Sequence, residues 1–81
     1  MFTIYRKRVG GQVFDRYYKE WDNAKHELLN ELAGTEKDGW TIDRRLDYFN
    51  AEKGFYIFEV YGRTDAGERF TLALVDGYFR D

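Results

Sequence analysis

The chain has 81 residues and a formal net charge of −2; 43% of its residues are hydrophobic, 20% are aromatic, and none is cysteine. This composition excludes a disulfide-stapled domain and a thiolate metal site, and it argues against a disordered chain or a general nucleic-acid binder. We expect one globular domain over residues 1–81, stabilised by packing of the large aromatic side chains.

The segment that follows Met1, Phe2-Thr3-Ile4-Tyr5, is typical of a strand and lacks the charged and apolar parts of a secretion signal. No apolar run approaches the roughly 20 residues that a membrane-spanning helix needs. We therefore expect a cytoplasmic protein with no membrane partner.

Two strands are predicted at the start of the chain. β-forming residues occupy 2–9, and Gly10-Gly11 is a two-residue hairpin signal because such turns need positive φ. The return strand is expected over 12–18. The stretch "DRYYKEW" leaves open an early start of the following helix instead.

Helical spacing begins at Trp21. The apolar residues that share one helix face are Trp21, Ala24, Leu28 and Leu32. Asp22 or Asn23 is the predicted N-cap, and Gly34 is the predicted left-handed end of the helix. The segment "GTEKDG" is then a polar connection, with one extra turn of helix left open as an alternative. A helix of about three turns is marginal alone in water, so it must pack on another element.

The second half of the chain predicts three strands. Apolar residues at Trp40, Ile42, Leu46 and Tyr48 alternate with polar ones, which is typical of a half-buried strand. The turns "NAEKG" and "TDAG" then bound strands over 55–62 and 69–75, and both end in glycine as a bulged hairpin requires.

These elements predict an α+β fold: a single antiparallel sheet of four to five strands, in the order β-β-α-β-β-β, with one amphipathic helix packed on one face. The last three strands form a meander. Alternation suggests that two sets of residues face the helix, namely Tyr56, Phe58 and Val60, and Phe70, Leu72 and Leu74. The reverse assignment of the strand over 55–62 stays open, because Phe55, Ile57 and Tyr61 are also apolar.

One short helix covers less than half of one face of such a sheet, so apolar side chains remain to be shielded. These candidate interface residues are Phe14, Phe49, Phe55, Ile57 and Tyr61. Exposed aromatic surface of this kind indicates a protein partner or a homodimer.

Basic residues form a second candidate site. They are Arg6, Lys7 and Arg8 in the first strand and Arg44 and Arg45 in the third. Such a patch binds phosphates or an acidic protein, whereas the simpler interpretation is a charged edge strand that resists aggregation. The segment "KGFYIFEVYGR" begins like an RNA-binding strand at Lys53-Gly54-Phe55, but Tyr56, Ile57 and Val60 depart from that pattern.

Catalytic chemistry has little support. The chain contains no serine and no cysteine, and His26 is its single imidazole. Asp43 and Asp47 would lie roughly 13 Å apart along a strand, too far for a paired-carboxylate mechanism. We expect no catalytic residue, no metal site and no cofactor.

The sequence therefore suggests a small non-enzymatic protein-binding module that self-associates through an aromatic sheet surface. One alternative is an inhibitor of a host enzyme encoded by a phage or mobile element, of the anti-CRISPR kind, which rests on small size and missing catalytic groups. Another is a nucleic-acid-binding protein that uses the basic N-terminal hairpin.

Overall fold

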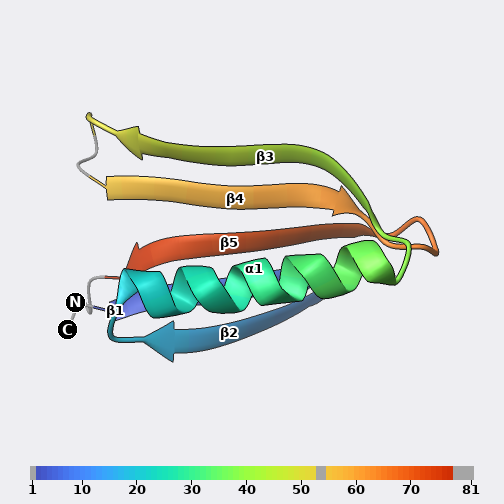
Figure 1. Ribbon diagram of the computed structural model, residues 1–81, viewed down its shortest axis with the longest axis horizontal. Helices are drawn as coiled ribbons and strands as arrows, with labels where there is room; N and C mark the ends of the chain where they lie inside the picture. The colour runs from blue at the N-terminus through green and yellow to red at the C-terminus, as the bar shows by residue number, and fades with distance from the viewer. Residues whose placement is uncertain (1, 53–54, 78–81) are drawn as a thin grey trace.

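The computed structural model describes residues 2–52 and 55–77, which form one antiparallel sheet and one helix, so the fold is α+β as predicted. The strands are β1 (Phe2–Val9), β2 (Gln12–Tyr18), β3 (Thr41–Asn50), β4 (Phe55–Arg63) and β5 (Arg69–Gly77), and the helix is α1 (Trp21–Lys37). The spatial order β2-β1-β5-β4-β3 contains the predicted meander and makes β2 and β3 the sheet edges (Figure 1). Among the described residues, no helix is both long and apolar enough to span a bilayer.

The N-terminal hairpin closes with a two-residue turn. Val9 lies opposite Gln12, and Gly10 has a φ of 57°, which a glycine adopts without strain. A positive φ at the first turn residue is what a type II′ turn requires. Residues 12–18 form a strand, so the alternative of an early helix start is wrong.

The helix begins two or three residues earlier than the predicted caps imply. Its N-cap is Glu20, whose side chain makes no capping hydrogen bond, while Asp22 and Asn23 lie inside the first turn. Asp22 still stabilises this end, because a carboxylate there interacts favourably with the helix dipole. The prediction of Asp22 or Asn23 as the N-cap is wrong.

The helix does not end at Gly34 but includes the extra turn that the sequence left open. It continues past Gly34 to Lys37, and the left-handed residue that follows is Gly39, with a φ of 84°. The extra turn is held by packing: Thr35 is buried, and its hydroxyl donates a 2.7 Å hydrogen bond to the carbonyl of Leu32. Tertiary burial therefore overrides the helix-breaking tendency of Gly34.

The core lies between α1 and one sheet face, mainly over β1 and β5 (Figure 1). The buried apolar residues that build it are Tyr5, Ala24, Leu28, Leu32, Phe58, Val60, Phe70, Leu72 and Leu74. This confirms the predicted helix face and the predicted inward side of β4 and β5. Trp21 is only partly buried, and the side chain of Tyr56 lies outside the described part of the structure.

An irregularity in β3 reverses its alternation. The register shifts between Ile42, which pairs with Gly62, and Arg44, which pairs with Tyr61. A bulge of this kind adds one residue, so every later side chain changes face. Leu46 therefore lies on the opposite face from Ile42, and the prediction of a single apolar face along this strand is wrong.

The same irregularity places Arg45 on the helix side, where it covers β4 together with Lys25 of α1. The Lys25 ammonium and the Arg45 guanidinium lie 5.1 Å and 5.2 Å from the centroid of the buried Phe58 ring. Lys25 also forms a 3.6 Å ion pair with Asp47. Long cationic side chains thus close the core over β4, with their charged ends near solvent.

Gly62 permits the closest approach in the sheet. A Cβ atom at this position would lie 2.1 Å from the carbonyl oxygen of Thr41 and 2.6 Å from the Phe70 ring. The ring of Phe70 in turn stacks at 5.0 Å from that of Trp40. The glycine therefore lets the β3 backbone and the Trp40–Phe70 pair pack over β4.

Replacing Leu28 by alanine should lower the free energy of unfolding by about 2–5 kcal/mol, because the side chain is fully buried and its loss leaves a cavity. Urea denaturation measures the change. Leu29→Ala, one position along at 37% exposure, is the matched control and should cost under about 1 kcal/mol. Equal effects of the two variants would contradict the observed helix face.

Two glycine-to-alanine substitutions should have opposite effects, because Gly62 is needed for close packing whereas Gly34 is not. Gly62→Ala should cost about 1–3 kcal/mol, since its Cβ meets backbone and ring atoms. Gly34→Ala should instead stabilise the protein by about 0.5–1 kcal/mol, because it lies in a helix and has open space around it. Thermal melts should show a lower melting temperature for Gly62→Ala and a higher one for Gly34→Ala than for the parent protein. Shifts of the same sign in both variants would contradict these roles.

Candidate protein interface

The sheet face opposite α1, here named the open face, is covered by no described element. Tyr5 and Lys7 of β1 point toward the helix, so Ile4, Arg6 and Arg8 point to the open face. Residues opposite one another in antiparallel strands share a face, so the pairing register extends this assignment across all five strands.

One end of the open face is apolar. Tyr17, Ile4 and Val75 lie side by side across β2, β1 and β5, and Ile57 pairs with Tyr48 across β4 and β3. Ile4 and Ile57 are half-buried, whereas the other three are exposed. Large apolar side chains thus remain in contact with solvent at this end.

The next row is mixed in character: Asp15, Arg6, Ala73, Glu59 and Leu46. The Arg6 guanidinium donates two hydrogen bonds to the Asp15 carboxylate, from Nε and from one terminal nitrogen, both at 2.9 Å. This bidentate pair raises the pKa of Arg6 and lowers that of Asp15. Its charges are therefore largely satisfied within the chain.

The other end of the open face is basic. Its row contains Val13, Arg8, Thr71, Tyr61 and Arg44. Neither of the two arginines forms an ion pair with another described residue. The Tyr61 hydroxyl donates a hydrogen bond to Glu59, and this bond, with burial as a smaller cause, raises the pKa of the phenol.

A hollow of about 600 Å³ opens beside this basic row. Arg63 and Arg69 line it, and their strands place them directly opposite each other. Asp43, on the bulge of β3, accepts hydrogen bonds of 3.2 Å and 3.1 Å from Arg63. Arg69 forms no ion pair within the described ranges, so the hollow offers an exposed guanidinium.

Of the residues that the structure describes, the open face therefore carries five arginines, at positions 6, 8, 44, 63 and 69, against three acids, at 15, 43 and 59. None of its described strand positions is a lysine. The described lysines lie on the helix side or in the connections: Lys7 and Lys25 contact α1 or lie on it, Lys37 ends it, and Lys19 precedes it.

The predicted interface residues divide between the two faces. Ile57 and Tyr61 lie on the open face, whereas Phe49 and Phe14 lie on the helix side, at the β3 and β2 edges respectively. Only the backbone of Phe55 is described, so its predicted role falls outside the described side chains. The predicted set is therefore not one contiguous surface.

Phe14 borders a second hollow, of about 520 Å³, between β2 and α1. Tyr5 forms its floor, and burial, with smaller contributions from Glu31 and Glu27, raises the pKa of that phenol. The walls carry balanced charge, because Lys7 pairs with Glu31 and Arg16 pairs with Glu27. This hollow lies on the far side of the sheet from the open face.

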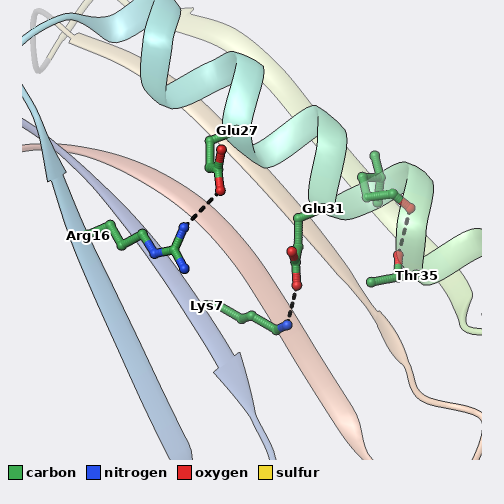
Figure 2. Close-up of polar contacts among 6 residues, drawn as sticks. Lys7, Arg16, Glu27, Glu31 and Thr35 are labelled. Carbon is green, nitrogen blue, oxygen red and sulfur yellow. Dashed lines mark hydrogen bonds and ion pairs between the residues drawn. The ribbon is translucent and has the colours of Figure 1, made fainter.

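The predicted basic patch is divided in the same way. Arg6, Arg8 and Arg44 lie on the open face. Figure 2 shows Lys7 reaching from β1 to Glu31 on α1, while Arg16 of β2 donates a 2.9 Å hydrogen bond to Glu27. Lys7 therefore attaches the helix to the sheet, and Arg45 covers Phe58, as described above.

Sequence reasoning missed several residues of the open face: Ile4, Tyr17, Tyr48, Arg63, Arg69 and Val75. The two-residue turn at Gly10-Gly11 fixes Tyr17 opposite Ile4. The shared face of these two residues could therefore have been predicted from the turn and the alternation of side chains along each strand. Tyr48 was assigned to the other face because nothing local in the sequence marks the register shift at Asp43.

Groups for catalysis or metal binding are sparse in the described residues. No cluster of three or more histidines, cysteines, aspartates or glutamates is placed there to hold a metal ion. His26 is exposed on α1, away from the open face. The chemistry that the open face offers is therefore hydrogen bonding, charge and apolar contact.

Comparisons of the chain with protein-family models, with curated proteins and with solved structures give no significant match.

The Arg6–Asp15 pair should make stability depend on pH in the acid range. The folded-state pKa of Asp15 lies below its usual 3.8, so the pair stabilises the fold above that value and loses its effect as pH falls through the folded pKa. Arg6→Gln should reduce the free energy of unfolding at neutral pH by under about 1 kcal/mol, because the pair is solvent-screened.

Urea denaturation at neutral pH and near pH 2 measures this effect. In Arg6→Gln the loss of stability between the two conditions should be smaller than in the parent protein. Arg44→Gln is the matched control, since Arg44 lies on the same face without an ion pair among the described residues. A change in the acid slope in both variants would contradict the assignment to Asp15.

Proposed function

We propose that this chain is a non-enzymatic protein-binding module that docks a partner protein on its open face. The observation that carries the proposal is the composition of that face. Tyrosine and arginine dominate its polar positions and lysine is absent from its described strands, as in the centres of protein interfaces, where tyrosine and arginine are enriched and lysine is depleted.

The partner's surface should be acidic opposite one end of the open face and apolar opposite the other. Two more arginines than acids lie on the face, and Arg8, Arg44 and Arg69 are without ion pairs to described residues. A carboxylate of the partner would enter the hollow beside Arg69 and accept bidentate hydrogen bonds. Tyr17 and Tyr48 would provide rigid anchors at the apolar end.

The size of the open face fits this role. Five strands at about 4.8 Å spacing and about eight residues in length give a surface of roughly 24 by 26 Å. That footprint is at the lower end of a standard interface, which takes about 800 Å² from each partner. The face therefore supports specific docking of a folded partner without further surface from elsewhere.

A second copy is a weaker match for this face. Stacking two open faces would place two positive surpluses in one interface, and like charges opposite one another cost free energy. Nucleic acid is also a weaker match, because half of the face is apolar and Arg6 and Arg63 are already held by carboxylates.

Charge reversal at the basic end tests the proposal. The double variant Arg8→Glu/Arg44→Glu should weaken binding of the purified partner by about tenfold or more, since it removes two attractions and adds two repulsions. The partner is first captured from an extract of the source cells and identified by mass spectrometry. Its affinity is then measured by calorimetry with purified components at low and high salt.

Lys19→Glu/Lys37→Glu is the matched control, because it changes the net charge equally at exposed positions away from the open face. This variant should bind as the parent protein does. Equal weakening in both double variants would contradict docking on the open face. Salt-dependent binding of a single-stranded oligonucleotide that is lost in Arg8→Glu/Arg44→Glu would favour nucleic acid instead.

A further inference from the structure

Strand β2 is an edge of the sheet on whose outer side no described strand or helix pairs. Among the described residues it pairs only with β1, and its register over Gln12–Tyr18 is continuous. It contains no proline, and six of its seven residues are exposed. Natural sheets usually blunt such an edge with a proline, a bulge or a covering loop.

Apolar side chains are concentrated on this edge. Tyr17 at 59% and Phe14 at 53% are the two most exposed large apolar residues of the described chain, and Val13, also on β2, is 48% exposed. Phe49 at 52% and Tyr48 at 45% lie on the other edge strand, β3. The charged residues between them are already occupied, since Asp15 binds Arg6 and Arg16 binds Glu27. The opposite edge, β3, is interrupted by its register shift, which disfavours pairing there.

The turn at Gly10-Gly11 determines which backbone groups of β2 point outward. A two-residue turn closes with a hydrogen-bonded pair, here Val9 and Gln12. Such pairs alternate along an antiparallel ladder, so even-numbered residues of β2 bond to β1. The N–H and C=O groups of Val13, Asp15 and Tyr17 therefore point away from β1.

We propose that two copies of the chain associate by antiparallel pairing of their β2 strands, about a two-fold axis through Asp15. This register pairs the whole of Gln12–Tyr18 and uses every outward-pointing residue, giving about six new backbone hydrogen bonds. The two five-stranded sheets become one continuous sheet. Both helices then lie on the same face of it.

The side chains fit this register. Val13 lies opposite Tyr17 of the second copy twice, and each of these pairs is apolar. On the helix side, Phe14 lies opposite Arg16 of the second copy, where a guanidinium and an aromatic ring attract. The two copies of Asp15 meet at the axis, but each carboxylate is neutralised by its bidentate bond to Arg6.

This complementarity favours a second copy over an unrelated strand. A two-fold axis places each residue of β2 opposite a residue of β2 in the second copy, so the strand must be complementary to itself. Val13 and Tyr17 form an apolar pair, and Phe14 and Arg16 form an aromatic–cation pair. The association leaves the open face exposed in both copies, so it does not rest on the proposed protein partner.

The mass of the protein alone tests the inference. Sedimentation equilibrium of the parent chain should give twice 9.7 kDa at high concentration. The variant Val13→Lys/Tyr17→Lys places like charges opposite each other twice, and it should weaken dimerisation by about tenfold or more. Tyr48→Lys, at an exposed tyrosine on the other edge strand, should leave the mass unchanged.

A cross-link tests the register, because the chain contains no cysteine. In Asp15→Cys the two thiols meet across a hydrogen-bonded pair with about 5.5 Å between Cα atoms, which allows a disulfide. Mild oxidation should give a covalent dimer from Asp15→Cys and not from Tyr48→Cys. If Val13→Lys/Tyr17→Lys fails to fold, cross-linking of Asp15→Cys still tests whether the β2 strands pair.

A monomeric mass at all concentrations, with no preferential cross-linking of Asp15→Cys, would overturn the inference. A dimer that survives Val13→Lys/Tyr17→Lys but is lost in Tyr48→Lys would also overturn it and assign the contact to β3 or to the open face. Neither result bears on docking of an acidic partner, which is measured separately with Arg8→Glu/Arg44→Glu.

Discussion

The structure depends on one constraint: a single helix must seal a five-stranded sheet. The buried face of α1, centred on Ala24 and Leu28, covers β1 and β5, and side chains must close the core over the remaining strands. The long side chains of Lys25 on α1 and Arg45 on β3 do so by lying over the Phe58 ring, and Trp40 does so by packing against Phe70 with the two rings tilted by 53°. The entire opposite face is left without a covering element among the described residues.

The two kinds of cation are distributed differently: no described lysine lies on the open face, whereas arginines lie on both faces, with Arg16 and Arg45 on the helix side. Lysines serve the helix side, where a flexible stem covers apolar surface and a compact charge reaches an acidic side chain, as Lys7 does with Glu31 (Figure 2). Arginines dominate the open face, where a planar guanidinium can donate two hydrogen bonds to one carboxylate, as Arg6 does to Asp15. The mild net charge of the sequence conceals this division, because the acids of α1 offset the arginines of the sheet.

Local patterns in the sequence were sufficient for the architecture. Alternation of apolar residues identified the inward sides of β4 and β5, and the glycine pair Gly10-Gly11 identified the first hairpin, because both signals act within a few residues. The wrong predictions concern features that depend on contacts between residues far apart in the sequence. Gly34 does not end the helix because Thr35 is buried beyond it, and Leu46 leaves the core side because Gly62 admits the bulged backbone of β3.

The candidate site was predicted less well than the fold for the same reason. Its residues come from five strands, and a single shift in register moves an entire strand segment to the other face. Phe49 and Arg45 were therefore grouped with residues that lie across the sheet from them. Ile57 and Tyr61 were grouped correctly with each other, because the alternation along β4 is regular.

The two proposed surfaces are compatible because they use different parts of the sheet. Pairing of β2 strands would place two open faces side by side in one plane, with the Tyr17 side chains at the seam and the basic rows at equal distance from the axis. A partner with two acidic sites would then bind both faces, and the second contact would form at a high effective concentration. Weak docking on a footprint at the lower end of the standard range would in this way become tight, without any further contact from either chain.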